Sequence, residues 1–161
     1  MTALLAALNM VLVMMFFPAG PGIVHLGDVI VLLAGCLLPA PYAMAAAVVG
    51  GGLGDWITGC SIWLPATVII KPAVAALFSA KQEKLLTRRN LLMLMPYAAI
   101  TLLGYALYKL LLVSLGLMDG GAWLAVLAAN VAGDSVQVIG SAAVFAAIGF
   151  AMDRAGLKKR I

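Results

Sequence analysis

Charged and amide side chains occur at a few isolated positions in a chain that is otherwise largely apolar. Asn130, Asp134 and Gln137 are spaced by four and three residues, which places them on one face of a helix. Ionisable groups inside a membrane helix are costly, and they commonly mark a binding pocket or a transport pathway. The spacing therefore predicts a polar stripe that binds a ligand or pairs with another helix.

Two other segments repeat this helical spacing. Trp63, Thr67 and Lys71 are separated by four residues each. A third stripe consists of Tyr97, Thr101, Tyr105 and Tyr108, with Lys109 beside it. Because Lys71 and Asn130 lie about seven or eight residues from the expected outer ends of their helices, both are about 10 to 12 Å deep. We therefore expect Lys71, Asn130 and Asp134 to meet in a polar pocket that opens outward.

A simpler interpretation also fits these residues. Lys71 and Asp134 could form a buried ion pair that only sets the register of two helices, since pairing is how membrane proteins usually accommodate charges. The tyrosine stripe could serve packing, and Trp63 could be an anchor at the membrane interface.

The segment over residues 17–28 is rich in glycine and proline and contains His25, the single histidine, and Asp28. Such a broken segment is tolerated at a membrane boundary where it faces water, a cavity or a ligand. One histidine and one carboxylate make a weak metal site, so we expect no metal, and Asp28 is expected to cap a helix or tether the loop. Asp55 is a further carboxylate inside an apolar run.

The composition identifies an integral membrane protein. Of 161 residues, 65% are hydrophobic and 10% are charged, and the mean hydropathy is +1.16. This length accommodates about six helices and no separate soluble domain, so we expect one all-α transmembrane domain over residues 1–161. The basic residues cluster within 81–89 and 154–160, beside apolar spans, which indicates membrane orientation and not binding of nucleic acid.

Hydropathy and turn residues predict helices over 3–17, 26–38, 41–58, 64–80, 91–113 and 122–152. Both basic clusters must be cytoplasmic, so both termini are expected inside and segments 18–25, 59–63 and 114–121 outside. The first two spans are short for a hydrocarbon layer of roughly 30 Å, so the second is expected to be tilted or partly re-entrant, or the loop before it to dip into the protein. Cys36 and Cys60 would then lie at opposite membrane faces, too far apart for a disulfide.

Small residues at helical spacing predict close contacts between helices, at Ala3 and Ala7 and at Gly50 and Gly54. Enzymatic activity is not expected, because the sequence contains no P-loop, zinc-protease or nucleophile-elbow motif. No cofactor is expected either.

Three segments together resemble the substrate-binding S component of energy-coupling factor (ECF) vitamin transporters, in the riboflavin-related branch that includes hydroxymethylpyrimidine and pyridoxine types. They are residues 22–28, the glycine-rich run that ends at Gly54-Asp55-Trp56, and residues 65–71. The resemblance covers nearly the whole chain, including its size, six helices and inside basic loop. The sequence lacks the Met-His start of the nickel and cobalt branch.

The resemblance implies a plasma-membrane protein that captures a vitamin from outside and docks on a transmembrane coupling protein carried by two ATPase subunits. It places the docking motif on Ala3 and Ala7, and the pocket beneath the first loop, walled by the outer halves of the last three helices. The residues expected to contact the solute are His25, Asp28, Asp55, Trp63, Thr67, Lys71, Tyr105, Asn130, Asp134 and Gln137.

The residues alone leave other functions open. The main alternative is a self-sufficient ion- or proton-coupled carrier that uses Asp134 or Asp55 as its titrating group. A small membrane enzyme, or a structural subunit whose buried charges only align helices, is a third. A pocket with tyrosines, a tryptophan, an amide and one or two charges suits a small heteroaromatic solute.

Overall fold

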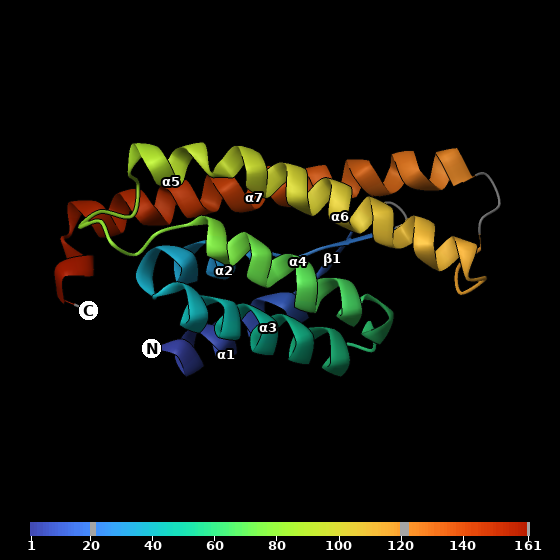
Figure 1. The fold of residues 1–161 in the computed structure, drawn as a ribbon, viewed down its shortest axis with the longest axis horizontal. Helices are drawn as coiled ribbons and strands as arrows, with labels where there is room; N and C mark the ends of the chain where they lie inside the picture. Colours follow the sequence, from blue (N-terminus) through green and yellow to red (C-terminus); the bar gives the residue numbers. More distant parts are fainter. Residues whose placement is uncertain (20–21, 120–122, 161) are drawn as a thin grey trace.

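In the computed structural model, long apolar helices run roughly along one direction and a short hairpin lies across one end of them (Figure 1). The structure describes residues 1–19, 22–119 and 123–160, with the backbone alone at 18–19, 22–23, 123–127, 129–130 and 160. The elements are α1 (Thr2–Met14), β1 (Phe17–Ala19), β2 (Gly22–Val24), α2 (Gly27–Leu37), α3 (Ala40–Ile57), η1 (Ser61–Trp63), α4 (Leu64–Leu77), α5 (Arg88–Leu92), α6 (Leu94–Ser114), α7 (Trp123–Arg154) and η2 (Leu157–Arg160).

All six predicted helices are confirmed within the described residues, as α1, α2, α3, α4, α6 and α7. The short α5 precedes α6 and is capped by Thr87, whose hydroxyl accepts a hydrogen bond from the Asn90 backbone N–H at 3.2 Å. The first helix ends at Met14, earlier than predicted. Pro18 lacks an N–H and disfavours helical geometry at Phe17, so the chain turns extended there.

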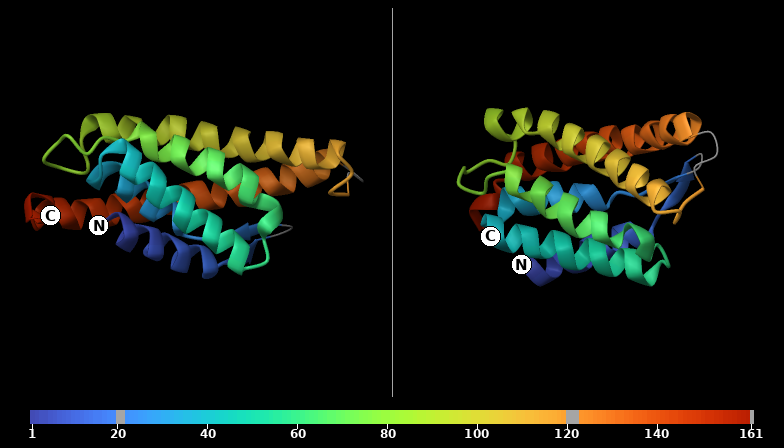
Figure 2. Two further views of the ribbon diagram at one scale, coloured as in Figure 1. Left: turned by 60° about the horizontal axis from the view of Figure 1, so that its bottom comes forward. Right: turned by 45° about the vertical axis from the view of Figure 1, so that its right-hand side comes forward.

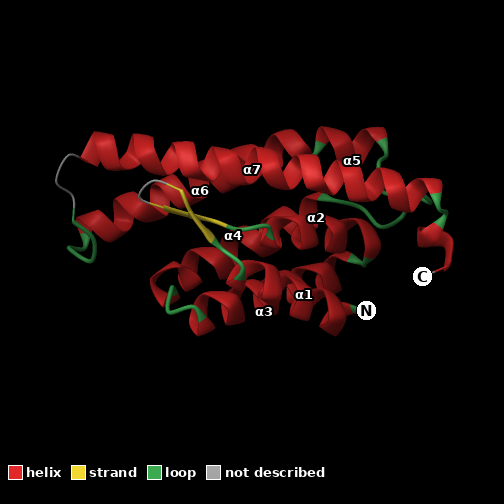
Figure 3. Cartoon of the chain, turned by 180° about the vertical axis from the view of Figure 1, so that it is seen from behind, coloured by secondary structure: helices red, strands yellow, loops and turns green. Residues whose placement is uncertain are grey.

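A short hairpin is added to the predicted all-α fold, which the helices confirm. β1 and β2 pair antiparallel, with Phe17 opposite Val24, Pro18 opposite Ile23 and Ala19 opposite Gly22. Figure 3 shows the two strands beside α7, and β2 contacts that helix. Backbone pairing between the strands satisfies groups that would otherwise be unpaired at a membrane boundary.

The two ends of the bundle differ in what they contain. Both termini lie at one end together with the segment that joins α4 to α5, whereas the hairpin, η1 and the end of α6 lie at the other (Figures 1 and 2). This agrees with the prediction that both termini and the basic segment within 81–89 lie on one side of the membrane, and the connections after the first, third and fifth predicted helices on the other. Cys36 and Cys60 are both free, as expected, and Cys36 lies buried near the end of α2.

The short helix α2 forms the centre of the bundle. Every residue from Gly27 to Cys36 is buried, and the helix contacts α1, α3, α4 and α7. Its 11 residues span only about 17 Å, less than a hydrocarbon layer. The hairpin strands and residues 25–26 come directly before α2 in the chain. At the end of the bundle opposite the termini, the first loop therefore occupies the length that α2 does not span (Figure 1).

The close approach predicted at Gly50 and Gly54 is confirmed between α3 and α1. A Cβ built on Gly50 would lie 2.4 Å from the Ala6 carbonyl oxygen, and one on Gly54 would lie 2.6 Å from Val13 Cγ1. Ala3 and Ala7, by contrast, are exposed on α1 and face away from this contact. Ala3 and Ala7 are therefore available for contact with another protein or with lipid.

Two helical stretches in the described residues are long and apolar enough to cross a membrane, Arg88–Ser114 and Val131–Arg154. Three shorter apolar helices accompany them, at Thr2–Met14, Gly27–Leu37 and Ser61–Leu77. Large apolar side chains are strongly exposed on these helices, including Ile69 (70%), Met95 (76%) and Ile139 (69%). Such a surface suits contact with lipid and not with water.

Candidate functional site

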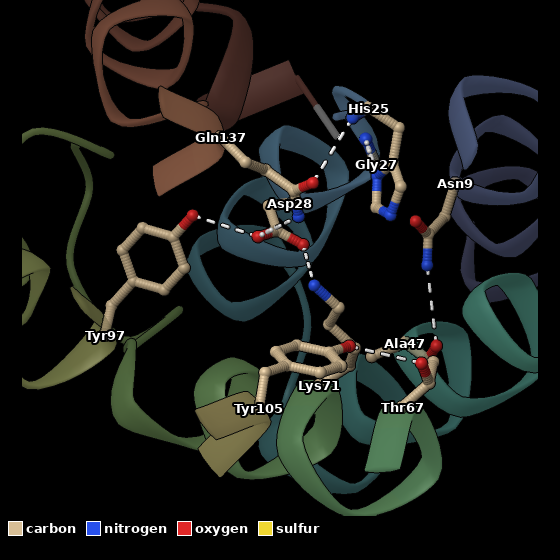
Figure 4. A network of polar contacts seen from close by, with 10 residues as sticks. All are labelled: Asn9, His25, Gly27, Asp28, Ala47, Thr67, Lys71, Tyr97, Tyr105 and Gln137. Carbon is tan, nitrogen blue, oxygen red and sulfur yellow. Dashed lines mark hydrogen bonds and ion pairs between the residues drawn. The ribbon is translucent and has the colours of Figure 1, made fainter. Parts of the chain in front are cut away.

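Asp28 is the centre of a buried polar cluster that joins four helices (Figure 4). It lies in the first turn of α2 and is 1% exposed. One carboxylate oxygen pairs with the Lys71 ammonium of α4. The other accepts hydrogen bonds from the Tyr97 hydroxyl of α6 at 3.0 Å and the Gln137 amide of α7 at 3.2 Å. Both oxygens are thus engaged, and three helices are held against α2.

The first loop is tied to the same cluster. Gln137 Oε1 accepts a hydrogen bond from the His25 backbone N–H at 3.2 Å, and the Gly27 N–H donates to His25 Nδ1 at 3.2 Å. Because Nδ1 accepts, the imidazole is neutral and carries its proton on Nε2. Gly27 admits no side chain, since a Cβ there would lie 2.6 Å from Val13 Cγ2. The expectation that the loop before the second span dips into the protein is consistent with these contacts.

The role of Asp28 differs from the expected one. We predicted that it caps a helix or tethers the loop, but α2 begins at Gly27 without a side-chain cap, and the Asp28 carboxylate binds side chains of other helices. It reaches the loop only through Gln137. A single apolar sequence window cannot reveal this role, because all three partners lie at least 43 positions away.

Aromatic side chains line the next layer, toward η1. Thr67 and Tyr105 share a hydrogen bond of 3.2 Å between their hydroxyls, and the Lys71 ammonium lies 5.3 Å from the centre of the Tyr105 ring. The Trp63 ring meets Tyr105 edge-on at 6.4 Å. Lys71 therefore has a carboxylate on one side and an aromatic face on the other, which is a favourable setting for a buried cation.

A second ion pair lies on α6 and α7, nearer the hairpin end of the bundle. Lys109 Nζ is 3.0 Å from Asp134 Oδ2 and 5.4 Å from the centre of the Trp63 ring. Tyr108 packs on Trp63 at 6.0 Å and donates to the Ile62 carbonyl oxygen at 2.6 Å. Trp63 consequently lies between the two charged clusters.

The alternative of a buried ion pair between Lys71 and Asp134 is wrong. Lys71 pairs with Asp28, and Asp134 pairs with Lys109. Both acids and both lysines occur in polar segments of an apolar chain, so spacing alone allows either pairing. The structure decides between them because helix rotation and depth bring α2, not α7, to Lys71. The predicted meeting of Lys71 with Asn130 stays a prediction, since the Asn130 side chain lies outside the described residues.

Tyr97, Lys109 and Asn9 contribute to the polar interior although they were not among the predicted binding residues. Tyr97 belongs to the tyrosine stripe and Lys109 lies beside it, so helical spacing was the signal that could have identified both as pocket residues. Asn9 is 2% exposed and donates to the Ala47 carbonyl oxygen at 3.4 Å. An isolated amide on the buried face of an apolar helix is the signal that could have identified it.

Asp55 is the remaining predicted acid, and it is 6% exposed on α3. Its Oδ2 atom has no hydrogen-bond partner among the described residues. The other predicted residues of this region, His25, Asp28, Thr67, Lys71, Tyr105 and Gln137, all have polar partners. Unlike these residues, Asp55 therefore has a carboxylate oxygen that accepts no hydrogen bond from the described residues.

A groove of about 700 Å³ lies at the opposite end of the bundle, where the termini are. It is lined by the α2–α3 connection and the segment after α4, including Leu38, Phe78, Lys81 and Arg89. None of the predicted binding residues lines it. Its position at the terminal end separates it from the Asp28 cluster.

Comparison with known proteins adds one finding. A family model described as "ECF-type riboflavin transporter, S component" matches residues 1–154. No curated protein matches the chain.

Proposed function

Because the chain belongs to the family of ECF-type riboflavin transporter S components, we propose that it captures a water-soluble vitamin or vitamin precursor from outside the cell. The family is one of membrane-embedded transporter subunits that bind substrate, and it is not a family of enzymes. The solute we propose is a small heteroaromatic, of the hydroxymethylpyrimidine or pyridoxine type. An ECF module with a coupling protein and two ATPase subunits would supply the energy.

The proposed orientation puts both termini in the cytoplasm of a plasma-membrane protein. The basic residues of 81–89 and 154–160 support it, since positive charge in short loops marks the cytoplasmic side. The hairpin, η1 and the end of α6 would then face outward, at the end of the bundle opposite the termini. A solute from outside would meet the hairpin and Trp63 before the Asp28 cluster.

One observation carries the proposed binding site: polar side chains of α4, α6 and α7 converge on Asp28 of α2, and the first loop joins this cluster through the His25 backbone N–H and Gln137. The Lys109–Asp134 pair and Trp63 lie nearer the hairpin end of the bundle. A few placed polar groups among aromatic and apolar walls orient a small solute and make it selective. The proposed contacts are His25, Asp28, Asp55, Trp63, Thr67, Lys71, Tyr105, Asn130, Asp134 and Gln137.

Docking is proposed on α1. Ala3 and Ala7 are exposed, and large apolar side chains such as Leu4 (58%) and Leu8 (43%) flank them. Small residues let a second helix approach closely in a membrane, where close packing drives association. This face therefore suits a helix of the coupling protein.

The test is a binding screen with purified protein in detergent. Native mass spectrometry and thermal shift are measured against vitamins and their precursors, including riboflavin, pyridoxine and hydroxymethylpyrimidine. We expect one compound to bind and raise the melting temperature. Tyr105→Phe, which removes one pocket hydroxyl, should weaken that binding by roughly 3- to 10-fold, since a buried hydrogen bond contributes about 0.5 to 1.5 kcal/mol.

The matched control is Tyr42→Phe, which removes a hydroxyl from a tyrosine that is 58% exposed on α3. It should leave binding unchanged. Equal effects of the two variants, or binding that survives Asp134→Asn and Lys71→Ala unchanged, would contradict the proposed site. Uphill transport by the chain alone in proteoliposomes would favour the ion-coupled carrier instead.

A further inference from the structure

Asp55 is a buried acid with an unused acceptor. The residue is 6% exposed, and Oδ2 has no hydrogen-bond partner in the part of the chain that the structure describes. Asp28 shows the contrast, because both of its oxygens are bound by donors from other helices. An unpaired carboxylate oxygen in a low-dielectric interior is expensive, and no side chain that the structure describes supplies the missing donor.

The position of Asp55 is set by the contact between α3 and α4. One turn before it, a Cβ on Gly51 would lie 2.8 Å from Thr67 Cγ2 and 3.9 Å from Lys71 Cγ. Residues four apart share a helix face, so Asp55 also faces α4. It interacts electrostatically with both Lys71 and Tyr105. The free acceptor thus belongs to the same polar interior as the Asp28 cluster.

The charges of this interior do not balance. By formal count, the carboxylates of Asp28 and Asp55 contribute two negative charges, whereas Lys71 contributes one positive charge and the His25 imidazole is neutral by its hydrogen bond from Gly27. Lys109 is committed to Asp134 in the second cluster. The interior around Asp28 therefore has a formal charge of −1 and an excess of acceptors.

We propose that Asp55 receives an amino or protonated nitrogen of the substrate, so that the transported vitamin is an amine-bearing heteroaromatic. The inference rests on the proposed function, and it names the class of solute within it. An amino donor would fill the vacant acceptor, and a cationic nitrogen would also neutralise the excess charge. A charge-assisted hydrogen bond of this kind is roughly twice as strong as a neutral one.

The test compares pairs of compounds that differ only at the donor. One pair is pyridoxamine and pyridoxine, in which an aminomethyl group replaces a hydroxymethyl group. The other is 4-amino-5-hydroxymethyl-2-methylpyrimidine and its 4-hydroxy analogue, and riboflavin serves as a flavin without an exocyclic amine. Dissociation constants are measured by calorimetry on the wild type and on Asp55→Asn, with Asp55→Glu as the variant that retains the charge.

We expect the amino member of at least one pair to bind the wild type about 30-fold more tightly than its partner, the lower end of what a buried charge contact contributes. Asp55→Asn should abolish that preference, and Asp55→Glu should restore part of it. Glu83→Gln removes a carboxylate from an exposed loop residue and should leave the preference intact. Melting curves of every variant without ligand show whether it folds.

Three results overturn the inference. If riboflavin or a hydroxyl analogue binds tightest and Asp55→Asn leaves its affinity unchanged, Asp55 is a neutral protonated acid, and the proposed function stands without this assignment. If no compound of the panel binds the wild type, both the inference and the proposed function fail. A preference for the amino compound that Asp55→Asn does not alter would place the amine elsewhere and also overturn it.

Discussion

The buried pair of Lys71 and Asp28 allows a quantitative test of the architecture. The two side chains are 4% and 1% exposed and link α4 to α2 at the centre of the bundle. Removing one member leaves the other charged and buried without its partner, which typically costs about 3 to 5 kcal/mol. Lys71→Met and Asp28→Asn should therefore each lower the free energy of unfolding by roughly that amount.

The double variant should lose far less than the sum of the two. Replacing a buried pair as a unit is often close to neutral, because the desolvation cost disappears together with the attraction. The Asp28→Asn substitution keeps a carbonyl oxygen that can accept from Tyr97 or Gln137, which donate to Asp28 Oδ2 in the wild type. We expect a double-variant cost of about 1 to 3 kcal/mol and hence a coupling energy of about 3 kcal/mol or more.

The assay is reversible unfolding in mixed micelles with increasing fractions of denaturing detergent, followed by circular dichroism. The matched control is the pair of Lys159 and Glu83, whose atoms are 2.9 Å apart but whose side chains are 64% and 78% exposed. The Glu83→Gln and Lys159→Met cycle should show no measurable coupling, because water screens exposed pairs. Additive losses in the Lys71 and Asp28 cycle would refute the pairing on which the site is built.

Two further predictions concern packing and docking. Gly50→Ala should lower the free energy of unfolding by about 1 to 3 kcal/mol, because its Cβ would lie 2.4 Å from the Ala6 carbonyl oxygen. The control is Gly140→Ala on α7, where a Cβ would meet nothing within 4 Å, and it should raise the free energy of unfolding by about 0.5 to 1 kcal/mol. If thermal melts show equal effects of the two substitutions, the close contact at Gly50 is contradicted. Ala7→Phe should weaken binding to a coupling subunit by roughly tenfold while solute binding stays intact, whereas Ala76→Phe at an exposed alanine of α4 should not. Pull-down with the ECF module measures this, and loss of solute binding as well would indicate misfolding.

Local sequence patterns were sufficient for the helices. Long apolar runs must form helices in a membrane, because every backbone group has to be paired within the segment, and Pro and Gly mark where the runs end. The prediction of a helix to residue 17 was wrong, because residues 17–19 pair with residues 22–24 as short antiparallel strands. A strand of three residues is too short to produce a recognisable periodicity, so only its pairing reveals it.

The sequence by itself determined which helix faces are polar, because a spacing of three or four residues stacks side chains on one face whatever the neighbours are. It also determined that Gly50 and Gly54 could admit a second helix closely. Only the tertiary structure decided that Lys71 pairs with Asp28 and not with Asp134, and that Asp55 keeps a free oxygen among the described residues. Partner choice depends on the rotation and depth of each helix relative to the others, which are set by packing over the whole bundle and leave no local trace in the sequence.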